Sequence, residues 1–166
     1  MSASNSYTRG TTISAGTLIA SGSGTVGAST NSLTIATGAT FDIRRTYDLV
    51  VSALSMSGTA SITNSTGSTS SLTVNGTAAL SGSITTKNDQ TYNGIATLQG
   101  NTTLTSTNGS ITFADQVRSS VDKSYSLTVS ASQGIATISG AIGGNFTGST
   151  LTSAARLDSL SVTALT

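Results

Sequence analysis

The amino-acid sequence predicts an all-β fold, a right-handed parallel β-helix (β-solenoid) of about eight coils with a period of about 20 residues. Two observations favour this fold. A short phrase of alternating apolar and hydroxyl residues, followed by a glycine-containing corner, recurs along the chain. No segment of ten or more residues has the apolar period of an amphipathic helix. We therefore expect almost no helix.

The recurring phrase carries a leucine near its start. Leu33, Leu54 and Leu72 are separated by 21 and 18 residues, and similar phrases occupy 32–41, 53–62, 71–80 and 126–140. A short strand with one apolar face cannot bury that face alone, so neighbouring copies must cover it. Coiling places successive copies in parallel register about 4.8 Å apart. The spacing therefore predicts that the three leucine side chains point inward and stack in one column.

Three Asn-Gly pairs lie between the apolar segments: Asn75-Gly76, Asn93-Gly94 and Asn108-Gly109. Both residue types tolerate the positive φ that sharp corners need. The pairs are also typical of two-residue hairpin turns in an antiparallel sheet. We favour coil corners, because the repeated phrase returns in the same orientation.

The alternation divides the chain into two parts. Residues 1–10 lack it and are predicted to be an irregular lead-in, whereas 11–166 are predicted to form a single solenoid domain. The first residues contain no apolar stretch of the kind found in a secretory signal. No segment approaches the roughly 18 apolar residues that indicate a membrane-spanning helix, so no membrane span is expected.

Hydroxyl groups rather than ions make this chain polar. Ser and Thr supply 63 of the 166 residues, and charged residues make up 8%, against about 25% in an ordinary domain. The net charge is +1, and the one adjacent basic pair, Arg44-Arg45, is flanked by Asp42 and Asp48. We interpret this pair as a locally neutralised surface bend. No basic stripe is present, so no nucleic-acid partner is expected.

The sequence lacks most of the residues that catalysis requires. Without His or Cys, Ser–His–Asp and Cys–His arrangements are impossible. Neither Lys87 nor Lys123 belongs to a Ser-x-x-Lys motif that is accompanied by its partner motifs, and Asp115 and Asp122 resemble a charged loop. The glycine-rich segment 143–148 lacks the aspartate of calcium-binding β-rolls. We therefore expect no enzyme, no cofactor and no metal.

A Thr-x-Thr spacing occurs at Thr103/Thr105 and again at Thr105/Thr107. Ice-binding solenoids carry flat ladders of threonine with this spacing. Because the pattern does not recur in every predicted coil, we interpret the segment as an ordinary exposed strand.

The segment Gln90-Thr91-Tyr92-Asn93-Gly94 resembles the opening of repeats in large bacterial secreted adhesins. Segments 102–106, 109–113, 126–129 and 139–144 follow in the order of filamentous-haemagglutinin-like and autotransporter-passenger-like repeats. The resemblance covers 71–145 and, loosely, 11–70. It implies a right-handed parallel β-helix on the outside of Gram-negative cells, with no catalytic residues. The family's secretion domain, with its Asn-Pro-Asn-Gly motif, has no counterpart in this Pro-free sequence.

These observations predict a structural or adhesive β-helix of a bacterial cell-surface or extracellular assembly, stacked end to end into fibres or forming part of a longer adhesin stalk. A host or matrix surface is a further expected partner. The alternative is a polysaccharide-binding or polysaccharide-cleaving β-helix similar to a phage tailspike. Such a protein needs an aromatic or Asp-lined groove, for which the available aromatic residues are Tyr7, Tyr47, Tyr92, Tyr125, Phe41, Phe113 and Phe146.

The final stretch, 157–166, alternates like an internal strand up to its last residue. A solenoid end exposes an unpaired strand edge and an open apolar column, which natural repeats usually seal with a polar cap. The sequence predicts no such cap at either end. We therefore expect an assembly interface formed by Leu157, Leu160, Val162 and Leu165, in head-to-tail contact with another copy or with adjacent repeats. A heterologous contact of this kind grows into a filament unless it closes into a ring.

Overall fold

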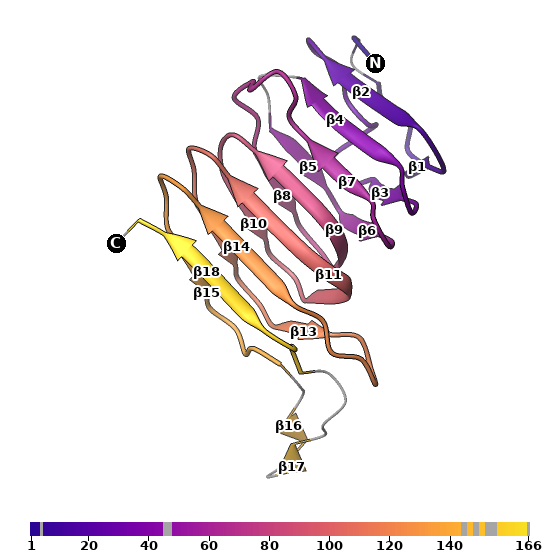
Figure 1. The fold of residues 1–166 in the computed structure, drawn as a ribbon. Coiled ribbons are helices and arrows are strands. Elements are labelled where there is room, and N and C mark those ends of the chain that lie inside the picture. Colours follow the sequence, from indigo (N-terminus) through magenta and orange to yellow (C-terminus); the bar gives the residue numbers. More distant parts are fainter. Residues whose placement is uncertain (4, 45–47, 144–145, 148–149, 152–155, 166) are drawn as a thin grey trace.

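The computed structural model describes residues 1–3, 5–44, 48–143, 146–147, 150–151 and 156–165. Every regular element among them is a β-strand, which confirms the predicted all-β fold. The strands belong to consecutive coils stacked along one axis, so the molecule is a parallel β-solenoid (Figure 1). The N-terminus lies at one end of the stack and β18 lies at the other (Figure 1).

The strands are short, as expected for a chain that turns a corner every few residues. They are β1 (Thr11–Ile13), β2 (Thr17–Ser21), β3 (Ser32–Ile35), β4 (Thr40–Arg44), β5 (Leu49–Val51), β6 (Ala53–Met56), β7 (Ser61–Thr63), β8 (Leu72–Val74), β9 (Ala78–Thr86), β10 (Gln90–Tyr92), β11 (Ala96–Ser106), β12 (Ile111–Phe113), β13 (Val117–Ser119), β14 (Leu127–Ala131), β15 (Ala136–Ile138), β16 (Phe146–Thr147), β17 (Thr150–Leu151) and β18 (Leu160–Ala164).

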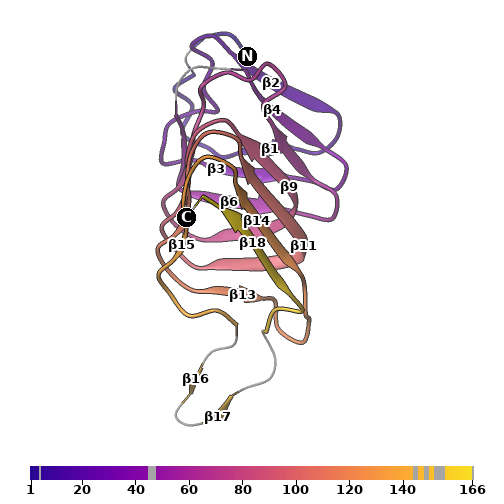
Figure 2. The ribbon, with the colours of Figure 1, turned by 60° about the vertical axis from the view of Figure 1, so that its left-hand side comes forward.

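Each complete coil contributes a strand to three faces, and the coils lie side by side in Figures 1 and 2. Face 1 contains β1, β3, β6, 78–80 of β9, 96–98 of β11, and β13. Face 2 contains β2, β4, β7, 82–86 of β9, 102–106 of β11, β14 and β18. Face 3 contains β5, β8, β10, β12 and β15. All these pairings are parallel, so each coil bonds to its neighbours along the axis.

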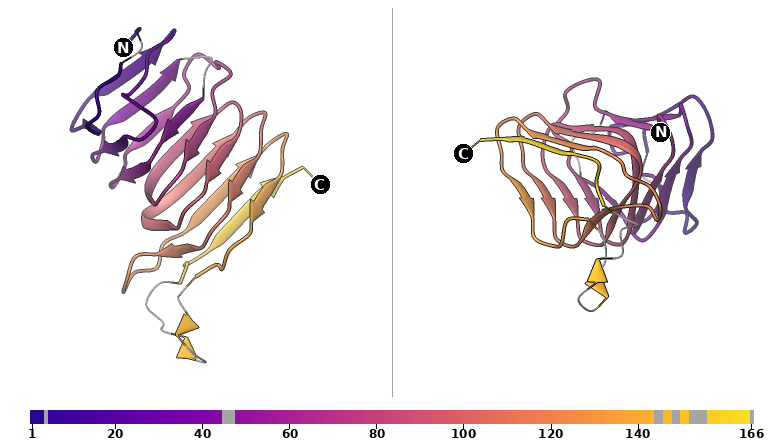
Figure 3. Two further views of the ribbon diagram at one scale, coloured as in Figure 1. Left: turned by 180° about the vertical axis from the view of Figure 1, so that it is seen from behind. Right: turned by 60° about the horizontal axis from the view of Figure 1, so that its bottom comes forward.

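The registers give the length of a coil. Ile13 pairs with Ile35 and Leu33 pairs with Leu54, which are steps of 22 and 21 residues. The coils average about 22 residues and make about six turns, so the expected eight coils are too many. The largest difference arises near the C-terminal end, where Leu127 pairs with Leu160, 33 residues further on. The antiparallel strands β16 and β17 lie in that interval and extend away from the stack (Figure 3).

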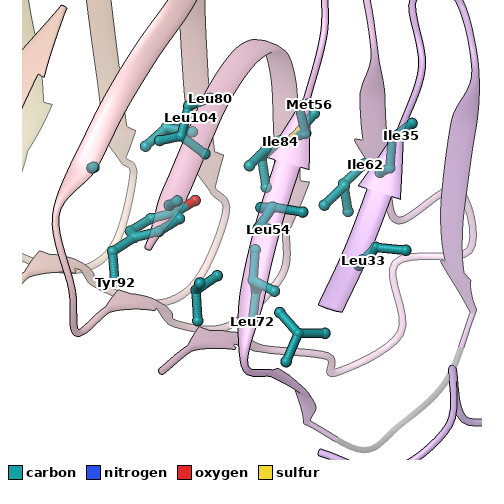
Figure 4. Packing of buried hydrophobic residues seen from close by; sticks show 14 of the residues in the cluster. Leu33, Ile35, Leu54, Met56, Ile62, Leu72, Leu80, Ile84, Tyr92 and Leu104 are labelled. Atoms are coloured by element: carbon teal, nitrogen blue, oxygen red, sulfur yellow. The ribbon is translucent and has the colours of Figure 1, made fainter. Parts of the chain in front are cut away.

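The interior of the solenoid is a set of columns of apolar side chains from successive coils (Figure 4). Ile35 lies in register with Met56, and Ile62 lies in register with Ile84. All four side chains are buried. The backbone groups of each strand pair with the coils before and after it, so this packing leaves few polar groups unsatisfied.

Leu72 does not belong to the column of Leu33 and Leu54. Leu33 pairs with Leu54 on face 1, where Ala78 occupies the next position, whereas Leu72 lies on face 3 in register with Leu49. The prediction of one shared column is therefore wrong for Leu72. Phrases with the same Leu-Thr-Val or Leu-Thr-Ile pattern occur on both faces, so spacing alone cannot assign them to a face.

The Asn-Gly pairs lie at corners between parallel strands, which confirms the coil interpretation and excludes hairpin turns there. Their glycines do not have positive φ, contrary to expectation. A Cβ atom on Gly94 would lie 2.6 Å from the carbonyl oxygen of Gly76, so the glycine is needed for close stacking of corners. At the same corner, the side-chain amide of Asn93 donates to the Oδ1 atom of Asn75 at 3.2 Å.

Candidate assembly site at the C-terminal end

The last strand of face 2 continues the core pattern to the end of the stack. In β18, Leu160 pairs with Leu127, and Val162 pairs with Val129. Leu127 and Val129 are 0% and 1% exposed, whereas Leu160 and Val162 are 38% and 48% exposed. Because parallel partners in register point to the same side of a sheet, Leu160 and Val162 occupy core positions. They are exposed because no further coil among the described residues covers them.

The other two faces also end with apolar residues at core positions that are not fully covered. On face 1, Ile142 bridges to the buried Val117 and is 50% exposed. On face 3, Ile138 pairs with the buried Phe113 and is only partly buried. The sequence interpretation missed both residues. The sequence pattern around these two residues is weak, because Ile142 lies outside any regular strand and Ile138 is the last residue of a strand of three.

Two more of the four predicted interface residues lie near this end, in different environments. Leu157 is partly buried and packs against the core cluster. Leu165 is 57% exposed, and its N–H donates to the carbonyl oxygen of Gly134 at 3.1 Å. The structure therefore brings Leu160 and Val162 together as the centre of an end surface, with Leu165 at its edge. Leu157 packs against the core next to this surface and is not part of its exposed centre.

The opposite end of the stack is covered by the chain itself. The Met1 ammonium group donates to the carbonyl oxygen of Ile19 at 2.5 Å, and the Ser21 N–H donates to the carbonyl oxygen of Met1 at 2.8 Å. The side-chain amide of Asn31 donates to the carbonyl oxygen of Tyr7 at 2.6 Å. The inward residues of this coil are accordingly buried: Ile13, Ala20 and Val26. The two ends therefore differ: the C-terminal one presents exposed core positions on faces 1 and 2 and a partly buried one on face 3.

The structure places the aromatic residues of the alternative, polysaccharide-binding interpretation mainly in the core. Phe41, Tyr92 and Phe113 are buried, and the rings of Tyr92 and Phe113 stack with centroids 4.8 Å apart. Burial raises the pKa of the Tyr92 hydroxyl, which donates to the Oε1 atom of Gln90 at 2.9 Å. Tyr47 and the side chain of Phe146 lie outside the described residues. Tyr7 and Tyr125, on different coils, are the described aromatic residues left for a groove.

Asp42 is the most buried carboxylate among the described residues, and hydrogen bonds from neighbouring residues hold it in place. Asp42 is 3% exposed, and its oxygens accept hydrogen bonds from the Ser65 N–H at 3.1 Å, the Ser65 hydroxyl at 2.7 Å and Arg44 Nε at 2.7 Å. Burial alone would raise the pKa of Asp42, but the bonds from Ser65 and Arg44 outweigh it and lower that pKa. The Asp42–Arg44 ion pair agrees with the predicted local neutralisation, although Asp42 points into a buried site. Arg45 lies outside the described residues.

Among the described residues, no three acidic side chains lie close enough together to hold a metal ion. The described residues also contain no helix that is long and apolar enough to span a membrane. Comparison of the chain with protein-family models, curated proteins and solved structures finds no match. The resemblance to secreted adhesin repeats therefore stays a prediction.

Proposed function

We propose that this protein is a structural β-solenoid that joins a larger assembly through its C-terminal end. One observation carries the proposal: Leu160 and Val162 occupy core positions in register with Leu127 and Val129, yet both are exposed. In the interior coils, the next coil covers such side chains. The end surface therefore has the chemistry of an incomplete core, and it fits a partner that supplies another β-strand with an apolar face.

The partner that we propose is a second copy of this chain. A copy offers an open strand edge that can bond to the free edge of β18, and a matching set of exposed apolar side chains. Full burial of a leucine or valine side chain contributes about 1.5–3 kcal/mol relative to exposure, so covering Leu160 and Val162 favours association. The side chain of Ile142 adds to the same surface.

The difference between the two ends favours one geometry of assembly. Residues near Met1 already bond to β2, so head-to-tail contact requires them to move away from that strand. Contact between two C-terminal ends joins two open edges around a two-fold axis, with each β18 antiparallel to its copy. We therefore propose paired C-terminal ends as the first step. Both C-terminal ends are occupied in such a pair, so growth into fibres would require contact between N-terminal ends as a second, separate step.

The setting that we propose is a bacterial cell surface or an extracellular assembly, in which the solenoid is a structural or adhesive element. Two observations support this setting. Segment 71–145 resembles repeats of secreted adhesins, and the surface is rich in hydroxyl groups and poor in charge. A host or matrix surface is then a partner of the whole assembly.

Sedimentation velocity over a range of concentrations tests the proposal. Leu160→Lys/Val162→Lys places two charges at the open core positions and should keep the protein monomeric. Ser161→Lys/Thr163→Lys is the matched control, because it adds the same charges to the outward side of the same strand. The wild type and the control should associate as concentration rises, and electron microscopy should distinguish paired rods from filaments. A folded wild type that stays monomeric at high concentration would contradict the proposal.

A further inference from the structure

The outward side of face 2 carries two rows of hydroxyl residues that run along the solenoid axis. One row follows directly from the registers of the strands, and it consists of Thr17, Thr40, Ser61, Ser83, Thr103, Thr128 and Ser161. The second row lies two residues further along each strand, and its members in five successive coils are Thr63, Thr85, Thr105, Ser130 and Thr163. We call these five pairs of residues, from β7 to β18, the hydroxyl array.

The array was missed in the sequence because serine alternates with threonine. Counting threonine alone gives a complete Thr-x-Thr pair only within β11. When either hydroxyl residue is counted, the pair recurs in β7, β9, β11, β14 and β18, at the same register in each coil. The interpretation of 103–107 as an ordinary exposed strand therefore overlooked a regular surface.

Backbone geometry fixes the spacing of the array in two directions. Neighbouring coils place equivalent hydroxyl residues about 4.8 Å apart, and residues i and i+2 of one strand are about 6.7 Å apart. The inward residue between the two rows is buried in the interior coils, as for Ile62, Ile84, Leu104 and Val129. Core packing therefore holds the strands, and the hydroxyl positions form a rigid two-dimensional lattice.

The hydroxyl groups of the array are free to bond to an external partner. Thr103, Thr128, Ser161 and Thr163 are exposed, and the other members are half-buried. The one side-chain hydrogen bond within the protein that the described array makes joins Ser61 to Thr40 at 2.9 Å. Charged residues are excluded from the lattice: Asp42 precedes it on β4, and Lys87 lies beyond the end of β9. The array thus presents hydroxyl and methyl groups only.

We propose that the hydroxyl array binds the surface of an ice crystal. Water molecules in ice form a rigid lattice with repeat distances close to those of the array, and each hydroxyl can replace or order one of its waters. Because the protein side is held in place before binding, little side-chain freedom is lost. The threonine residues of the array also carry methyl groups, and apolar groups of this kind favour ordered water around them.

Other partners fit this surface less well. A polysaccharide is usually held by stacking on aromatic rings, and no position of the array is aromatic. A charged macromolecule requires complementary charges, which the array lacks.

Faces 1 and 3 do not carry a comparable lattice of hydroxyl residues. The outward row of face 1 is interrupted by Ala79 and Arg118, and face 3 has a single threonine row bordered by Asp89 and Ile135.

The test measures incorporation of fluorescently labelled protein into slowly growing ice, together with inhibition of ice recrystallisation. Thr103→Lys/Thr105→Lys disrupts the centre of the array and should remove most of both activities. Thr91→Lys/Asn93→Lys makes the same change on face 3, in β10 and at the residue after it, and should behave like the wild type. Thr103→Val/Thr105→Val keeps the side-chain shape without the hydroxyls, and it replaces the lysine variant if circular dichroism shows that the latter is unfolded.

The outcomes are distinct from those of the assembly test, because the array and the end surface use different residues. Leu160→Lys/Val162→Lys should retain incorporation into ice even if it abolishes association. Exclusion of the wild type from growing ice would overturn the inference. Equal loss in the face 3 variant would do the same, as would binding to crystalline cellulose without binding to ice.

Discussion

Leu72 lies in register with Leu49 of the preceding coil, and both side chains are fully enclosed, with 0% and 1% exposure. This contact is part of the face 3 column. Replacing Leu72 with Asp would bury an unpaired carboxylate among apolar side chains, which costs several kcal/mol. We expect this variant to be unfolded at room temperature by circular dichroism. Thr73→Asp, on the outward side of the same strand, should remain folded; its unfolding would contradict the assigned register.

The corner at Gly94 has no room for a side chain, so any substitution there should destabilise the fold. A Cβ atom there would lie 2.6 Å from the Gly76 carbonyl oxygen, and backbone atoms of a stacked coil cannot rotate away. We expect Gly94→Ala to lower the free energy of unfolding by roughly 1–3 kcal/mol. The adjacent, exposed Asn93 should tolerate alanine within about 0.5 kcal/mol. Urea unfolding of both variants measures the difference, and equal effects would exclude steric stacking as the reason for glycine.

Asp42 should make stability depend on pH in the acid range. Its pKa is lowered in the folded protein, so its contribution is present above the unfolded value of about 3.9 and is lost as the pH falls through the folded value. Asp42→Asn should therefore be less stable than the wild type at neutral pH and should lose less stability on acidification. Asp122→Asn removes an exposed carboxylate and is the control. Parallel pH profiles for Asp42→Asn and the wild type would be evidence against this role.

The buried Gln90 side chain makes hydrogen bonds to groups on two neighbouring coils. Its Nε2 atom donates to the carbonyl oxygen of Thr105 at 2.9 Å, and its Oε1 atom accepts from the Tyr92 hydroxyl at 2.9 Å. Gln90→Leu would leave the buried Tyr92 hydroxyl without its bond to Gln90, so we expect a loss of about 1–3 kcal/mol in unfolding free energy. A double-mutant cycle with Tyr92→Phe should show coupling between the two sites. Strict additivity would mean that the bond contributes nothing.

The sequence contains enough information for the fold class and for the place of Leu160 and Val162 in the pattern of the last strand. Alternation in short segments and the absence of a helical period predicted the parallel solenoid, because only stacking buries one face of a short strand. Leu160 and Val162 were predicted for the same reason, since 157–166 continues the alternation. The positions that close faces 1 and 3 were not predicted, because Ile142 and Ile138 belong to segments too short to show a period.

Register explains the other differences. Leu33 and Leu72 carry similar phrases but lie on different faces, and only hydrogen-bond pairing separates them. The hydroxyl array is a property of residues some 20 positions apart, so it becomes visible only when coils are aligned. In the sequence, Gln90 is only the first residue of a repeat-like segment, and register shows that it occupies a core position between Leu72 and Ile111. The order of residues along the chain does not by itself show which strands of successive coils pair.

The most direct test of the central claim, that β18 is the site of assembly, is hydrogen–deuterium exchange of the 160–164 amides at low and high protein concentration. Covering the open edge with another copy should slow exchange in this strand as concentration rises, whereas the amides of the interior strand β14 should not change. Leu160→Lys/Val162→Lys should abolish the concentration dependence. Exchange in β18 that is independent of concentration, while the protein associates, would show that assembly uses another surface and would contradict the account.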